Sequence, residues 1–132
     1  MNTLRIVIEK STDFYDAYAE NCEGVYGAGE TVELAKANVL EGIELLKKTK
    51  SFNELPDILK EDYQVIFHFD TKSFLNYYNK VFSNVALERL TGINQKLLHH
   101  YASGLRTPRD KQRKKIEQAL HNLGRELLAI EL

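Results

Sequence analysis

The chain has a single cysteine, Cys22, and therefore forms no internal disulfide bond. It also has no apolar run approaching the roughly 18 residues that a membrane-spanning helix needs. Its first residues, Met1 to Glu9, alternate in polarity and lack the basic stretch and apolar core of a secretory signal. These absences predict a protein of the reducing cytoplasm without a membrane partner.

The formal net charge of −1 conceals a division between the two halves of the chain. Residues 1–72 hold 8 Lys and Arg against 14 Asp and Glu, a net charge of −6, and residues 73–132 hold 10 against 5, a net charge of +5. The basic half suits a polyanion. The acidic half suits either a basic partner or plain solvation.

Residues 1–70 begin with the pattern of a small sheet. Three segments, residues 3–10, 14–20 and 25–29, carry the period-two alternation or the turn boundaries that are typical of short strands. Short strands that follow one another closely predict an antiparallel meander.

The period then changes to that of a helix. Apolar residues at helical spacing predict a helix over 32–48, with Thr31 as its N-cap. After an irregular segment with Pro56, residues 63–69 are rich in β-branched and aromatic side chains and predict another strand. We therefore expect an α+β domain with a small three- or four-stranded antiparallel sheet and one helix. Such a domain buries a modest core, which favours a homodimer or tetramer.

Residues 71–132 are helical in pattern and predict a separate all-α domain. Thr71 is the expected N-cap of the first of these helices. The expected helices cover residues 72–81, 85–91, 95–102, 110–122 and 124–130.

Residues 86–108 contain the most informative pattern in the chain. Gly92 ends one helix, where a positive φ angle favours glycine. Ile93 is the apolar residue of the turn, and Asn94 caps the next helix. Gly104 ends that second helix, and Pro108 fixes the loop that follows.

This stretch resembles the Cro/repressor-type (XRE-like) helix-turn-helix, with its pattern Leu-Ala-x-x-x-Gly-(Ile/Val)-Ser, recognition helix and Gly-x-Arg-x-Pro. Glu88 departs from the pattern because the family has a small alanine there, and Ala102 departs because glutamate is common there. The matching residues are Leu87, Gly92, Ile93, Leu98, Gly104, Arg106 and Pro108.

The resemblance implies that the helix from Gln95 enters the major groove of double-stranded operator DNA. Glutamine suits adenine and lysine suits guanine, while arginines in the following loop suit phosphate. The alternative is a helical bundle with a solvated basic face. The DNA-binding residues that the resemblance predicts are Asn94, Gln95, Lys96, His99, His100, Arg106 and Arg109, and Lys111, Arg113, Lys114 or Lys115 would add phosphate contacts.

The first half resembles the HicB antitoxin domain, a partial RNase H-like fold. The usual Leu-Pro-Gly-Cys segment of that family is replaced here by Asn21-Cys22-Glu23-Gly24-Val25. The residues that match are Ile8-Glu9, Tyr15, Tyr18, the run Gly27-Ala28-Gly29-Glu30-Thr31, Ala35, Asn38 and Leu45-Leu46.

This second resemblance implies an antitoxin of a type II toxin-antitoxin system. Such a protein neutralises a HicA-like toxin, an mRNA-cleaving protein, by direct binding, and its helix-turn-helix tail represses the operon that encodes both. The acidic first half fits a basic, RNA-binding partner. The candidate toxin-binding residues are Asp13, Asp16, Glu20 and Glu23.

The sequence leaves two other functions to consider, a nuclease and a stand-alone regulator. A nuclease of RNase H type needs clustered carboxylates for two metal ions, whereas Asp13, Asp16 and Glu20 spread over a turn and a strand. The adjacent His99 and His100 point about 100° apart on a helix and form no chelating pair. We therefore expect no catalytic residue, metal or cofactor. The remaining alternative is a stand-alone transcriptional regulator whose first domain binds a small effector.

Overall fold

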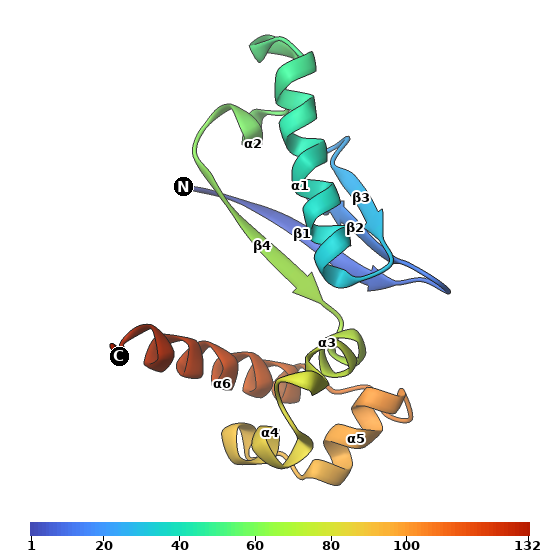
Figure 1. The fold of residues 1–132 in the computed structure, drawn as a ribbon, viewed down its shortest axis with the longest axis vertical. Helices are drawn as coiled ribbons and strands as arrows, with labels where there is room; N and C mark the ends of the chain where they lie inside the picture. Colours follow the sequence, from blue (N-terminus) through green and yellow to red (C-terminus); the bar gives the residue numbers. More distant parts are fainter. The chain divides into compact units, whose positions relative to one another are not determined.

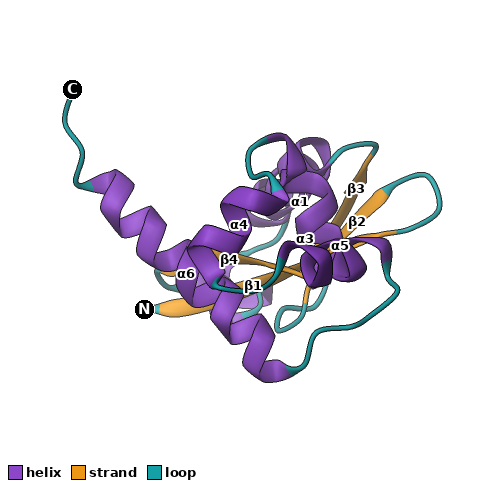
Figure 2. Cartoon of the chain, turned by 90° about the horizontal axis from the view of Figure 1, so that it is seen from below, coloured by secondary structure: helices purple, strands orange, loops and turns teal.

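The computed structural model describes all 132 residues, which divide into two compact units, Met1–Asp70 and Thr71–Leu132. The first unit is α+β and contains every strand of the chain, whereas the second contains helices only (Figure 2). The expected α+β class is therefore confirmed.

A four-stranded sheet forms the first unit, in the order β3-β2-β1-β4 (Figure 1). Its strands are β1 (Asn2–Lys10), β2 (Tyr15–Ala19), β3 (Tyr26–Gly29) and β4 (Tyr63–Phe69). The first three pair antiparallel, which confirms the predicted meander.

The prediction of an antiparallel sheet is wrong for β4, which pairs parallel with β1. The reason is the connection between β3 and β4. Helix α1 (Val32–Thr49), the 3-10 turn η1 (Phe52–Glu54) and the short helix α2 (Asp57–Lys60) bring the chain back to the end where β1 begins. Parallel neighbours require a crossover of this kind, so the sheet is mixed.

Helix α1 covers one face of the sheet and closes the core of the first unit. Thr31 caps α1, since its hydroxyl oxygen accepts a hydrogen bond from the Leu34 N–H at 3.1 Å, as the sequence predicts. The apolar stripe of α1 packs against the strand residues of the same face. The buried residues of this core include Leu4, Ile6, Ile8, Ala17, Val32, Ala35, Val39 and Ile43.

The helix lies unusually close to β3 because that strand has glycines on the covered face. A Cβ atom on Gly27 would lie 2.6 Å from the Val39 nitrogen, and one on Gly29 would lie 2.5 Å from the Ala35 nitrogen. Between these contacts, the Asn38 side chain accepts a hydrogen bond from the Ala28 N–H at 2.9 Å. The backbones of α1 and β3 are thus held together directly.

Lysines of α1 extend over the aromatic side chains of β4. The Lys36 ammonium lies 4.6 Å from the ring centre of Phe67 and 5.4 Å from that of Phe69, and the Lys47 ammonium lies 4.7 Å from that of Tyr63. Cation–π attraction of this kind joins the helix to the edge strand. Burial lowers the pKa of Lys36, whereas a hydrogen bond with Tyr63 raises the pKa of Lys47.

The second unit consists of helices α3 (Thr71–Tyr77), α4 (Asn84–Thr91), α5 (Gln95–Ser103) and α6 (Asp110–Leu128), with a 3-10 turn, η2 (Tyr78–Lys80), after α3. Thr71 is the first residue of α3 and not the residue before it, and α3 ends earlier than predicted.

The predicted break between two last helices is also wrong, because α6 runs without interruption through Gly124. A glycine inside a helix costs only about 1 kcal/mol relative to alanine, which does not end a helix whose apolar stripe continues on both sides. In the second half of α6, Leu127 and Leu128 are exposed.

No helix of the chain is both long enough and apolar enough to cross a membrane.

The close contact between α1 and β3 leads to a stability prediction. We expect Gly29→Ala to lower the free energy of unfolding by about 1–3 kcal/mol, because the added methyl group overlaps the backbone of α1. Urea denaturation measures the change. Gly124→Ala is the control, since a Cβ at this helical position meets nothing within 4 Å. It should instead stabilise the chain by up to about 1 kcal/mol. Equal stability of Gly29→Ala and the parent chain would contradict the proposed overlap.

Candidate nucleic-acid interface

Helices α4 and α5 are joined by a tight three-residue turn, Gly92 to Asn94. Gly92 has a φ angle of 75°, in the left-handed region that favours glycine, and ends α4. Ile93 is 2% exposed and enters the core. The Asn94 side chain accepts a hydrogen bond from the Lys96 N–H at 2.8 Å and caps α5. Each of these residues has the local role that the sequence predicts.

Thr91 holds this turn through its side chain, a role that the sequence analysis missed. Its buried hydroxyl donates a hydrogen bond to the Leu87 carbonyl oxygen at 2.6 Å and accepts one from the Ile93 N–H at 3.1 Å. The hydroxyl therefore satisfies a backbone N–H that would otherwise be buried without a partner.

The inner face of α5 packs on the core of the second unit. Asn76 on α3 also donates a hydrogen bond to the Ala102 carbonyl oxygen at 2.8 Å, near the end of α5. Packing and hydrogen bonding thus fix how α5 lies against α3 and α4. The buried core residues are Leu75, Leu87, Ile93, Leu98, Tyr101 and Ile116.

The outer face of α5 carries the predicted base-reading side chains. Gln95, Lys96 and His99 are exposed, whereas His100 is half-buried. Asn94 is exposed, but its side-chain oxygen Oδ1 already accepts the capping hydrogen bond of α5. The outer face at the start of α5 therefore offers one amide, one ammonium and one imidazole group.

Basic residues follow α5 in the chain. Arg106 and Arg109 are exposed in the segment between α5 and α6, with the buried Pro108 between them. Arg113 forms an ion pair with Asp110 in the first turn of α6. The whole unit, residues 71–132, has 11 Lys and Arg against 5 Asp and Glu, a net charge of +6.

Glu88 makes a contact that the sequence analysis did not foresee. Its Oε2 atom accepts a hydrogen bond from the Gln95 N–H at 2.6 Å, so a carboxylate of α4 lies at the first turn of α5. Only the fold brings these residues together, because seven positions and a turn separate them.

The first unit presents a second surface, the face of the sheet opposite α1. Val7, Tyr18, Tyr26 and His68 lie side by side across all four strands there. We call this the open face. Tyr26 is 74% exposed and Tyr18 is 39% exposed. Ile66, two residues before His68 on the same face of β4, is 46% exposed. The open face therefore joins exposed aromatic and aliphatic side chains from separate strands.

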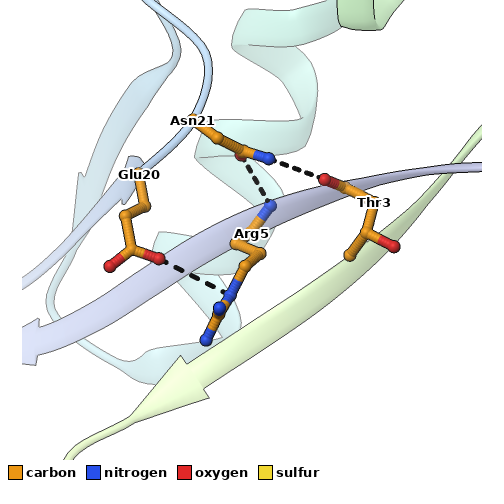
Figure 3. Close-up of polar contacts among 4 residues, drawn as sticks. All are labelled: Thr3, Arg5, Glu20 and Asn21. Carbon is orange, nitrogen blue, oxygen red and sulfur yellow. Dashed lines mark hydrogen bonds and ion pairs between the residues drawn. The ribbon is translucent and has the colours of Figure 1, made fainter.

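Carboxylates surround these apolar side chains on the open face. Glu9 and Asp16 are direct cross-strand neighbours, an arrangement of like charges that destabilises a sheet. Tyr18 donates a hydrogen bond from its hydroxyl to Glu9 at 3.0 Å, which raises the pKa of Tyr18. Glu20 pairs with Arg5 at 3.5 Å (Figure 3).

Of the four candidate toxin-binding residues, the fold brings Asp16 and Glu20 to the open face. Asp13 lies in the turn before β2 and Glu23 in the turn after it, at opposite ends of that strand. The four carboxylates therefore do not form one cluster.

The Asn21 side chain continues the hydrogen bonding to β1 beyond the end of β2. Its side chain accepts a hydrogen bond from the Arg5 N–H at 3.0 Å and donates one to the Thr3 carbonyl oxygen at 2.7 Å (Figure 3). The side-chain amide thus makes two hydrogen bonds with the backbone of β1, in place of those that a further residue of β2 would make. An open hollow of about 630 Å³ lies beside it, and its lining residues are Asn2, Thr3, Asn21, Asp57, Ile58, Lys60 and Glu61.

His, Cys, Asp and Glu side chains are the remaining groups with metal-binding or nucleophilic chemistry. No group of three or more His, Cys, Asp or Glu side chains is placed to hold a metal ion. Cys22 is buried, and burial raises the pKa of its thiol, which disfavours the nucleophilic thiolate.

No protein-family model matches this sequence, no curated protein is significantly similar to it, and no solved structure has a significantly similar fold.

The turn between α4 and α5 gives a direct test of the local structure. Thr91→Val keeps the side-chain shape but removes the hydroxyl, so we expect a loss of about 1–3 kcal/mol in unfolding free energy and faster exchange of the Ile93 amide proton. Thr91→Ser is the matched control because it retains the hydroxyl. Urea denaturation and amide hydrogen exchange report the two effects. An unchanged Ile93 exchange rate in the valine variant would show that the hydroxyl does not hold the turn.

Proposed function

We propose that the second unit binds double-stranded DNA as a helix-turn-helix, with α5 as the recognition helix in the major groove. One observation carries the proposal: Gln95, Lys96 and His99 are exposed together on the outer face of a helix whose inner face is fixed in a core. An α-helix fits the major groove, and rigid support lets its side chains meet base edges in a constant register.

The chemistry of the exposed groups assigns their roles. Gln95 suits adenine, which presents one donor and one acceptor, and Lys96 suits the two acceptors of guanine. Arg106 and Arg109 suit phosphates beside the groove, and the net charge of +6 attracts the duplex as a whole. His99 is a further candidate for a base contact, whereas the half-buried His100 is less accessible.

We also propose that the first unit binds a basic protein, as an antitoxin binds a HicA-like mRNA-cleaving toxin, while the second unit represses the shared operon. The first unit has 7 Lys and Arg against 14 Asp and Glu, a net charge of −7. On the open face, the adjacent carboxylates of Glu9 and Asp16 would be relieved by a cationic partner. Exposed Tyr26 and Ile66 offer the apolar contacts that commonly anchor an interface.

The main alternative is a stand-alone regulator whose first unit binds a small effector. The hollow beside Asn21, with its polar side chains, is the observation that favours it. The two functions differ in the surface they use, since an effector would occupy the hollow and a protein partner would cover the open face.

The DNA-binding proposal predicts different effects for two cationic residues. Lys96→Ala should reduce discrimination between sequences, at a cost of about 1–3 kcal/mol for the preferred site. Arg106→Ala should weaken all sequences alike and flatten the dependence of log K on log salt by about 0.9. Fluorescence anisotropy with a duplex selected from a random library, and with a scrambled duplex, measures both.

Lys50→Ala is the control for these variants, because Lys50 is exposed in the first unit. It should leave both duplex affinities unchanged. If Lys96→Ala and Arg106→Ala bind the two duplexes as the parent does, α5 is not the recognition helix.

The partner proposal predicts that a charge in the open face blocks binding. The measurement is co-purification with a small basic protein encoded beside this gene, together with suppression of its toxicity. Ile66→Lys should weaken co-elution at least about tenfold, because a like charge meets the basic partner. Leu45→Lys is the control, since Leu45 is 61% exposed on α1, away from the open face. If Ile66→Lys still retains the partner, the contact lies elsewhere on the first unit.

A further inference from the structure

Glu88 places a negative charge at the start of α5. It is half-buried on α4, and its Oε2 atom accepts the Gln95 N–H at 2.6 Å. The next amide of α5, that of Lys96, is already bound by the Asn94 side chain at 2.8 Å. The first two N–H groups of α5, which have no partner within the helix, thus each donate a hydrogen bond to a side chain of the protein.

The start of a helix ordinarily attracts phosphate. Its first N–H groups have no partner within the helix, and the helix dipole places partial positive charge there. In this chain the Glu88 carboxylate occupies that position and supplies the negative charge. A DNA phosphate brought to the same place would meet repulsion and would find the Gln95 N–H already engaged.

The same hydrogen bond links two helices. Glu88 belongs to α4 and Gln95 to α5, so their contact spans the turn from Gly92 to Asn94. This hydrogen bond near the surface adds to the apolar contact that Ile93 makes in the core. A short bond to a charged acceptor is among the stronger hydrogen bonds.

We propose that Glu88 is a positioning and specificity-determining residue for DNA, which holds α5 to α4 and keeps phosphate away from the start of α5. This inference rests on the proposed DNA binding. Non-specific binding is driven by phosphate attraction, so a fixed carboxylate beside the reading side chains weakens it directly. In the specific complex the start of α5 faces base edges, where a carboxylate can accept a hydrogen bond that the amino group of cytosine donates. Glu88 therefore penalises wrong sequences more than the right one.

Two substitutions separate the effect of the negative charge of Glu88 from the effect of its hydrogen bond with the Gln95 N–H. Glu88→Gln keeps an oxygen that accepts the Gln95 N–H but removes the charge. Glu88→Ala removes both. Glu126→Gln is the matched control, because it removes the same charge from an exposed position in the second half of α6.

The experiment uses the full chain and measures anisotropy with the selected duplex and a scrambled duplex over a series of KCl concentrations. Glu88→Gln should bind the scrambled duplex about threefold to tenfold more tightly, with a smaller gain for the selected duplex, so that the specificity ratio falls. Glu126→Gln should leave that ratio unchanged. An unchanged ratio in Glu88→Gln, or an equal fall in Glu126→Gln, would overturn the specificity role.

Amide hydrogen exchange of Gln95, followed by NMR without DNA, tests the hydrogen bond between Glu88 and Gln95 separately. Glu88→Ala should accelerate this exchange about tenfold or more, and Glu88→Gln should restore most of the protection. Unchanged exchange in Glu88→Ala would overturn the positioning role. If the parent chain shows no sequence preference at any salt concentration, the proposed DNA binding fails and the specificity role fails with it. The Gln95 measurement still decides whether Glu88 joins the helices.

Discussion

The close approach of α1 to strand β3 is the contact on which the first unit depends. Gly27 and Gly29 allow the two backbones to meet, and the helix then closes the core over β1 and β2. The path of α1 also returns the chain to the place where β4 can run parallel with β1. Because the single long helix covers one side, the other side keeps its exposed aromatic and acidic residues. The open face is therefore a direct result of how the core is closed.

Local features of this fold follow from the sequence, whereas features that join distant segments do not. The roles of Thr31, Gly92 and Asn94 were predictable, because caps and left-handed turns depend on the chemistry of a few neighbouring residues. The direction of β4 was not, since it depends on the path of the whole connection. The predicted break between helices over 110–122 and 124–130 was wrong, because the small cost of a glycine inside a helix does not interrupt α6.

The candidate sites show the same division. Helical spacing predicts that Gln95, Lys96, His99 and His100 face outward, and the first three are exposed whereas His100 is half-buried. It did not show that Glu88 reaches the start of α5, because that contact depends on the angle between two helices. The sequence did separate Asp13, expected in a turn, from Asp16, expected on a strand, and the structure places the two residues in this way.

The two units carry net charges of −7 and +6, so the chain is nearly neutral in total although each unit by itself is strongly charged. Near its isoelectric point of about 6.4, the long-range repulsion that keeps protein molecules dispersed is almost absent, while unlike units of separate copies attract. Added salt screens that attraction over about 10 Å and so raises solubility. The same salt weakens the hold of a basic unit on a polyanion. Ionic strength thus acts in opposite directions on the amount of protein that stays dispersed and on the electrostatic attraction between the basic unit and a polyanion such as the DNA proposed as its ligand.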